Sequence, residues 1–69
     1  MYKVEDKKEY YIVEQLVAQN EKEYYEYGNH DVISITMIKK DRLYENTIEC
    51  LKEEIERRFD DKDITIIWE

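Results

Sequence analysis

The stretch that decides the fold is residues 32–38, Val-Ile-Ser-Ile-Thr-Met-Ile, in which large apolar side chains alternate with small polar ones. Ile33, Ile35 and Met37 fall on one side of an extended chain, and a serine and a threonine fall on the other. A period of two is typical of a β-strand with two different faces. We therefore predict a strand near residues 31–39.

A turn and a helix flank this strand. The turn is predicted at Gly28-Asn29-His30-Asp31, just before the strand. After it, apolar residues recur at helical spacing, namely Tyr44, Ile48, Leu51, Ile55 and Phe59. Side chains three and four residues apart share one face of a helix. Asn46-Thr47-Ile48-Glu49 fits a capping box with Asn46 as the cap, and Asp41 is an alternative cap one turn earlier. We predict one main amphipathic helix near 43–60.

Acidic side chains occupy a separate sector of this predicted helix, away from its apolar stripe. They are Glu45, Glu49, Glu53, Glu56 and Asp60. Like charges four residues apart weaken a helix by a few tenths of a kcal/mol per pair, roughly. The ridge is interpreted either as a solubilising face or as a mimic of phosphates.

The segment before the turn has two interpretations. Strands near 9–19 and 22–28, joined by a polar Gln19-Asn20-Glu21 turn, give a hairpin, which we prefer because their ends are rich in Tyr, Ile and Val. A helix ended by Gly28 is the alternative. A last strand is predicted near 63–68. Together these elements predict an α+β fold with a small antiparallel sheet and one main helix.

Length and composition limit how such a chain is stabilised. With 69 residues it is predicted to be a single domain, 1–69. Chains of this size bury only about 60% of their unfolded surface and usually need disulfides, a metal or oligomerisation. A single Cys50 and a single His30 allow neither an internal disulfide nor a structural zinc site. We therefore expect oligomerisation, with no metal and no cofactor.

The charge balance restricts the partners. Eighteen acidic and eleven basic residues give a net charge of −7. Direct binding of nucleic acid is disfavoured, because it requires Lys and Arg to displace phosphate counterions, whereas a partner with a basic surface is favoured. His30 and Cys50 lack the neighbours that catalysis needs, so we do not expect an enzyme. No apolar run is long enough for a membrane span or a signal peptide, and a soluble, cytoplasmic protein is expected.

Two motifs in the same order resemble a known family of viral proteins. They are Lys22-Glu23-Tyr24-Tyr25-Glu26-Tyr27 and Leu43-Tyr44-Glu45-Asn46-Thr47. A strand with Tyr11, Val13 and Leu16 precedes the first motif, so the resemblance spans roughly residues 10–51. The match is to the small uracil-DNA glycosylase inhibitors of small tailed phages with protein-primed DNA replication.

The resemblance implies a function and a set of partner-binding residues. Inhibitors of that family are homodimers that occupy the DNA-binding cleft of the glycosylase. Acidic side chains stand where DNA phosphates would lie, and an apolar pocket holds the side chain that the enzyme inserts into the duplex. Carried over to this chain, the resemblance points to Glu26, Asp41 and Tyr44. The partner-binding residues predicted beside these are Tyr24, Tyr25, Tyr27, Ile48 and Leu51.

Other interpretations remain open at this point. The tyrosines are equally explained by packing on a small sheet, Asp41 by helix capping and Tyr44 by the helix stripe. Among functions, one rival is an acidic phage-type inhibitor of a nuclease, a CRISPR effector or an RNA polymerase. The other is an acidic adaptor or assembly subunit that pairs its sheet with a partner.

Overall fold

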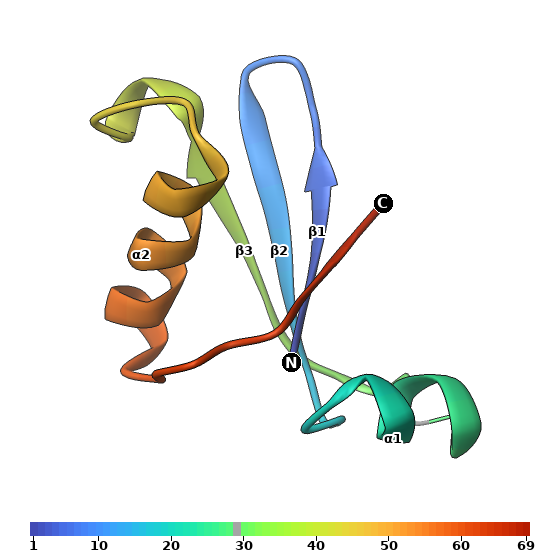
Figure 1. Cartoon of the computed structure of the whole chain (residues 1–69). Helices are drawn as coiled ribbons and strands as arrows, with labels where there is room; N and C mark the ends of the chain where they lie inside the picture. The colour runs from blue at the N-terminus through green and yellow to red at the C-terminus, as the bar shows by residue number, and fades with distance from the viewer. Residues whose placement is uncertain (29) are drawn as a thin grey trace.

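The computed structural model describes residues 1–28 and 30–69, and its α+β architecture confirms the predicted fold class. A mixed four-stranded sheet packs against one main helix (Figure 1). The elements are β1 (Tyr2–Asp6), β2 (Tyr10–Leu16), α1 (Glu21–Glu26), β3 (Val32–Lys39), a 3-10 turn η1 (Lys40–Arg42), α2 (Ile48–Phe59) and β4 (Ile66–Trp68). Asn29 of the predicted turn lies outside the described residues.

The strand order in the sheet is β3-β2-β1-β4. The first three strands are antiparallel neighbours, whereas β4 pairs parallel to β1. The prediction of a purely antiparallel sheet was therefore wrong. The chain returns from α2 and joins the free edge of β1, where the Tyr2 amide donates to the Thr65 carbonyl at 3.0 Å and the Glu69 amide to the Val4 carbonyl at 2.9 Å.

The N-terminal strand β1 was not predicted. Tyr2 and Val4 are buried on the side facing α2, while Lys3 and Glu5 lie on the other side. This alternation covers only five residues, which is too short to stand out in a highly charged sequence. Pairing with β2 along the full length of β1 is what fixes the strand.

The prediction of a strand at 22–28 was wrong, because this segment forms helix α1. Asn20 caps it, since its side-chain oxygen accepts from the Glu23 amide at 3.0 Å. Glu23 reaches back and accepts from the Gln19 amide at 2.7 Å. This exchange closely resembles a capping box, and it overrides the strand preference of the tyrosines. Equally, the alternative of one helix through 9–27 fails, because β2 occupies 10–16.

The main helix α2 is shorter than predicted at its N-terminal end. Its cap is Thr47 rather than Asn46, with the Thr47 hydroxyl accepting from the Cys50 amide at 3.1 Å. Residues 43–47 are therefore not helical, and the helix stripe does not begin at Tyr44. The C-terminal end agrees with the prediction, and Asp60 closes it in the left-handed conformation with φ 50°.

The core lies between α2 and one face of the sheet. Its buried members are Tyr2, Val4, Tyr11, Val13, Ile38, Leu43, Leu51, Ile55 and Ile64. The two buried tyrosines also bond to the two ends of α2. The Tyr11 hydroxyl donates to the Asn46 side chain at 2.7 Å, and the Tyr2 hydroxyl donates to Asp61 at 3.0 Å. A smaller cluster of Met1, Leu16 and Ala18, with Tyr24 and Ile67 packed on it, fixes α1 at one end of the sheet.

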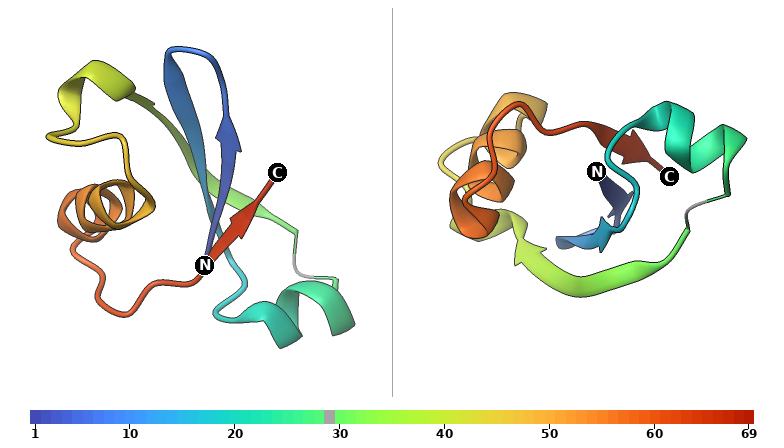
Figure 2. Two further views of the ribbon diagram at one scale, coloured as in Figure 1. Left: turned by 45° about the horizontal axis from the view of Figure 1, so that its top comes forward. Right: turned by 90° about the horizontal axis from the view of Figure 1, so that it is seen from below.

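Within residues 1–28 and 30–69, no helix covers the other face of β3. Strand β3 is the outermost strand in the right-hand view of Figure 2, where α2 lies on one side of the sheet and α1 at the far end. Ile33, Ile35 and Met37, which alternate with the half-buried Ser34 and Thr36, are 53–67% exposed. We call these three residues the β3 apolar face. No helix in the described part of the chain is long and apolar enough to cross a membrane.

We expect Leu51→Ala to destabilise the protein by about 2–5 kcal/mol, because Leu51 is fully buried and its loss leaves a cavity. The matched control is Ile48→Ala, one turn earlier on the same helix, where the side chain is 62% exposed. That change should cost under about 1 kcal/mol. Urea unfolding measures both, and equal losses would contradict this description of the core.

The buried hydroxyl of Tyr2 predicts a loss of stability at high pH. Burial, with the hydrogen bond to Asp61, raises the pKa of Tyr2 from 10.0 to about 12. Because the folded pKa lies above the unfolded one, stability that is fully present below pH 10 is lost as the pH rises towards 12. Tyr2→Phe should cost about 1 kcal/mol at neutral pH and remove this part of the alkaline loss. Unfolding curves from pH 7 upward would refute the assignment if both proteins declined in parallel.

Candidate functional site

The structure separates the predicted partner-binding residues into two groups at opposite ends of β3. Tyr24, Tyr25, Glu26 and Tyr27 belong to α1 and its C-terminal cap, before β3. Asp41, Tyr44, Ile48 and Leu51 follow β3, in η1, the next loop and α2. Figure 1 shows α1 and η1 at opposite ends of the strand. Eight strand residues span about 26 Å, so the two groups do not form one small site within a protomer.

The α1 group presents aromatic rings to solvent. Tyr25 and Tyr27 are exposed, as is Glu26. Tyr24 is half-buried, and its ring lies 5.0 Å from the Tyr25 ring and 4.2 Å from the His30 ring, measured between centroids. Tyr24 thus anchors α1, while Tyr25 and Tyr27 remain available to a partner.

The second group differs from the sequence prediction in where its apolar residues lie. Leu51 is fully buried in the core, so it holds α2 in place and does not reach the surface. Tyr44, which the helix stripe would have placed inside, is 93% exposed. The reason is that the preceding residue, Leu43, enters the core instead, and the loop turns the Tyr44 ring outward.

A shallow hollow lies between Tyr44 and the first turns of α2. It has a volume of about 380 Å³ and is lined by Tyr44, Glu45, Thr47, Glu49, Cys50 and Glu53. We call it the Tyr44 hollow. In the part of the chain that the structure describes, no Lys or Arg forms an ion pair with Glu45, Glu49 or Glu53. The hollow therefore combines an exposed aromatic ring with three uncompensated carboxylates.

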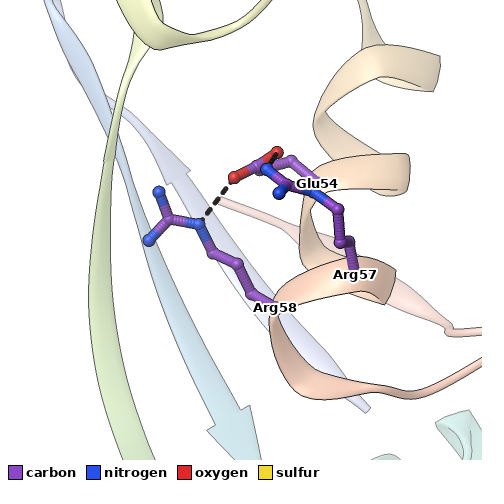
Figure 3. Close-up of polar contacts among 3 residues, drawn as sticks. All are labelled: Glu54, Arg57 and Arg58. Atoms are coloured by element: carbon purple, nitrogen blue, oxygen red, sulfur yellow. Dashed lines mark hydrogen bonds and ion pairs between the residues drawn. The ribbon is translucent and has the colours of Figure 1, made fainter.

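Two of the three bases of α2, Arg57 and Arg58, are engaged by Glu54. Figure 3 shows Glu54 between Arg57 and Arg58. The Arg58 side chain donates to Glu54 at 2.8 Å, and Arg57 forms a second ion pair with the same carboxylate. Hydrogen bonds from Arg57 and then Arg58 lower the pKa of Glu54. On the far side of Tyr44, Arg42 and Arg57 line a neighbouring hollow. Glu53 lines both hollows, whereas Glu45 and Glu49 line only the one without an arginine.

A second recess, of about 640 Å³, lies where β2 and β3 approach η1. We call it the Met37 recess; its lining is Glu9, Tyr10, Met37, Lys39, Lys40 and Asp41. The predicted residue Asp41 is therefore beside an apolar surface formed by Tyr10 and Met37. Of the two bases, Lys40 is already paired with Asp6 at 2.5 Å.

Several of these residues were missed by the sequence prediction. Tyr10 and Met37 come together only through strand pairing, in which Tyr10 lies opposite Lys39 and Ile12 opposite Met37. Glu49 and Glu53 were recognised as part of an acidic ridge, but their position beside Tyr44 depends on where the loop at 43–47 turns. The spacing of the ridge was the available signal.

No three His, Cys, Asp or Glu side chains among the described residues are arranged to hold a metal ion. Cys50 is a free, half-buried thiol packed against the core. The Tyr44 hollow and the Met37 recess offer surfaces that suit cationic and apolar groups.

Comparison with known proteins gives no relative: no protein-family model, no curated protein and no solved structure matches this chain.

The pairing of Glu54 predicts how the stability of α2 depends on pH. Because the folded pKa of Glu54 is lowered below 4.5, its contribution is present above that pH and lost as the pH falls through the folded value. Glu54→Gln should therefore destabilise the protein at neutral pH by a few tenths of a kcal/mol, roughly. The difference from the unchanged protein should shrink in acid. A difference independent of pH would contradict an ionic role for Glu54.

Proposed function

We propose that this protein is a non-enzymatic inhibitor of uracil-DNA glycosylase that acts as an acidic, homodimeric mimic of DNA. The observation that carries the proposal is the Tyr44 hollow, where Glu45, Glu49 and Glu53 lie beside an exposed aromatic ring and form no ion pair with any described Lys or Arg. An enzyme that binds DNA offers a track of Lys and Arg side chains, and unpaired carboxylates are suitable ligands for it.

The spacing of the carboxylates supports this reading. Glu49 and Glu53 are four residues apart on α2, which corresponds to about 6 Å along a helix axis. Successive phosphates of one DNA strand advance by about 3.4 Å along the duplex axis and also turn around it, so neighbouring phosphates are separated in space by roughly twice that advance. The two carboxylates can therefore stand near two neighbouring phosphate positions. Because α2 is packed on the core, the two charges are held in place before binding.

The apolar part of the mimicry is assigned to the Met37 recess. A glycosylase flips its target base out of the stack, and such proteins commonly insert an apolar side chain into the space left in the duplex. Tyr10 and Met37 provide apolar surface for that side chain, and Asp41 lies at the rim. Occupying both the basic track and the inserted side chain would block substrates of any sequence.

The α1 group has a smaller part in this proposal. Glu26, Tyr25 and Tyr27 lie at the opposite end of β3 from the Tyr44 hollow, so they would contact a different part of the enzyme. The resemblance alone gave Glu26 a central role, whereas the arrangement of charges favours Glu49 and Glu53.

The β3 apolar face favours a second candidate function. An acidic adaptor or assembly subunit would pair this exposed surface of Ile33, Ile35 and Met37 with a partner protein. Such a protein would leave uracil excision unchanged, and neutralising the carboxylates of α2 would have little effect on its binding.

The inhibitor proposal is tested by uracil excision from single-stranded and duplex substrates, with and without micromolar protein. We expect both substrates to be protected. The double variant Glu49→Gln with Glu53→Gln should weaken inhibition about tenfold or more, because it removes two fixed charges from the hollow. Unchanged excision at micromolar protein would exclude the proposal.

A matched control separates the hollow from net charge. The double variant Glu21→Gln with Glu26→Gln changes the net charge by the same amount, also on an exposed helical surface. It should weaken inhibition by less than the α2 pair. Equal effects of the two pairs would mean that total charge, and not the Tyr44 hollow, governs inhibition.

A further inference from the structure

Strand β3 is nearly self-complementary about Ile35. Residues at equal distances before and after Ile35 either match in polarity and size or carry opposite charges. The pairs are Ser34 with Thr36, Ile33 with Met37, Val32 with Ile38, and Asp31 with Lys39. The inner pairs match in polarity and size, and the outermost pair has opposite charges. An antiparallel strand that meets a second copy of itself across Ile35 would place each residue opposite its counterpart.

The backbone of β3 is free to make this pairing. Among the described strands, β3 lies at one edge of the sheet and pairs with β2 alone. The Lys40 amide donates to the Glu9 carbonyl at 3.0 Å, and Ile38 lies opposite Tyr11. Hydrogen-bonded pairs alternate along an antiparallel ladder, so the backbone groups of Ile35 and Met37 point away from β2 to the open edge.

We infer that two copies of this chain join β3 to β3, antiparallel, around a two-fold axis at Ile35. The result is one continuous eight-stranded sheet, made of four strands from each copy. In this register Ile35 is opposite its own copy, and Ile33 is opposite Met37. The inference rests on the homodimer in the proposed function and does not depend on which enzyme is inhibited.

The charges favour a second copy over an unrelated partner. Two chains with a net charge of −7 repel each other, so a stable contact needs a surface where acids do not face acids. Along β3 the only ionisable side chains of the pairing are Asp31 and Lys39, and the two-fold axis sets each opposite the other, twice per dimer. Exposed apolar edges normally carry charges or Pro as protection against pairing, whereas Ile33 to Ile38 carry neither.

The irregularity of β3 is confined to its first residues. The register against β2 shifts by one between Gln15 and Leu16, so that Leu16 faces Val32. From Ser34 to Lys39 the ladder is regular. Ile35 and the pair Ser34 with Thr36 thus lie within the regular ladder, whereas Ile33 is the extra residue at the shift.

The dimer would also complete the Met37 recess. Met37 lines this recess together with Tyr10 of β2, and the pairing brings Ile33 of the partner subunit directly opposite Met37. Each recess would then be bounded by apolar side chains from both copies. This placement gives a physical reason for an inhibitor of this size to act as a dimer.

Cysteine cross-linking tests the register in the full chain, with Cys50→Ser removing the native thiol. Opposed residues in a hydrogen-bonded antiparallel pair have Cα atoms about 5.5 Å apart, within reach of a disulfide. Ile35→Cys should therefore form a covalent dimer on mild oxidation. Met37→Cys alone should not, because its two copies would lie about 13 Å apart. A mixture of Ile33→Cys and Met37→Cys proteins should cross-link.

Sedimentation equilibrium tests the interface itself. Ile35→Lys puts two like charges face to face at the axis and should raise the dimer Kd about tenfold or more. Ile48→Lys is the matched control, since Ile48 is exposed to a similar extent, 62% against 67% for Ile35, but lies on α2. It should leave the Kd unchanged. A monomeric parent protein, or equal cross-linking at positions 35 and 37, would overturn the inference.

The same proteins separate this inference from the proposed function. A parent protein that is monomeric but inhibits uracil excision would overturn the β3 interface and leave the inhibitor role. A dimer that cross-links through position 35 but fails to inhibit would support the β3 interface and overturn the inhibitor role.

Discussion

The packing of one helix on one face of a thin sheet is the constraint on which the structure depends. Leu51 and Ile55 of α2 share a single core with Val4 and Val13 of the central strands. Tyr2 and Tyr11 extend from the same face to the two ends of the helix, and their hydroxyls bond to Asp61 and Asn46. At about 25 cal/mol per Å² of apolar area, so small a core has little stability to spare. The position of α2 is therefore fixed both by apolar burial and by hydrogen bonds at its two ends.

This arrangement determines what is left on the surface. With α2 on one face and α1 at one end, the sheet keeps an uncovered face on β3 and an open edge beside it. The same packing also decides which charged side chains of α2 are paired. Arg57 and Arg58 are engaged by Glu54, while Glu49 and Glu53, on the side of Tyr44, form no ion pair within the described residues. The acidic hollow and the apolar face are both consequences of where the one helix packs.

The sequence prediction was most accurate where a pattern was long and regular. Strand β3 and the C-terminal part of α2 were located closely, because several residues repeat with one period. The prediction failed where local hydrogen bonds decide the secondary structure. Three tyrosines in six residues favour a strand, yet the exchange between Asn20 and Glu23 starts a helix there. The Thr47 cap likewise begins α2 too late for Tyr44 to enter the core.

By itself, the sequence determined the α+β class, the acidic character and the two motifs that carry the resemblance, since composition and periodicity are local properties. Only the tertiary structure decided which residues meet. Glu26 belongs to α1 and Asp41 to η1, and these two elements lie at opposite ends of β3. By contrast, Tyr10 and Met37 share one recess with Asp41. Strand order and register bring such residues together, and both are set by how the whole chain buries one face of the sheet.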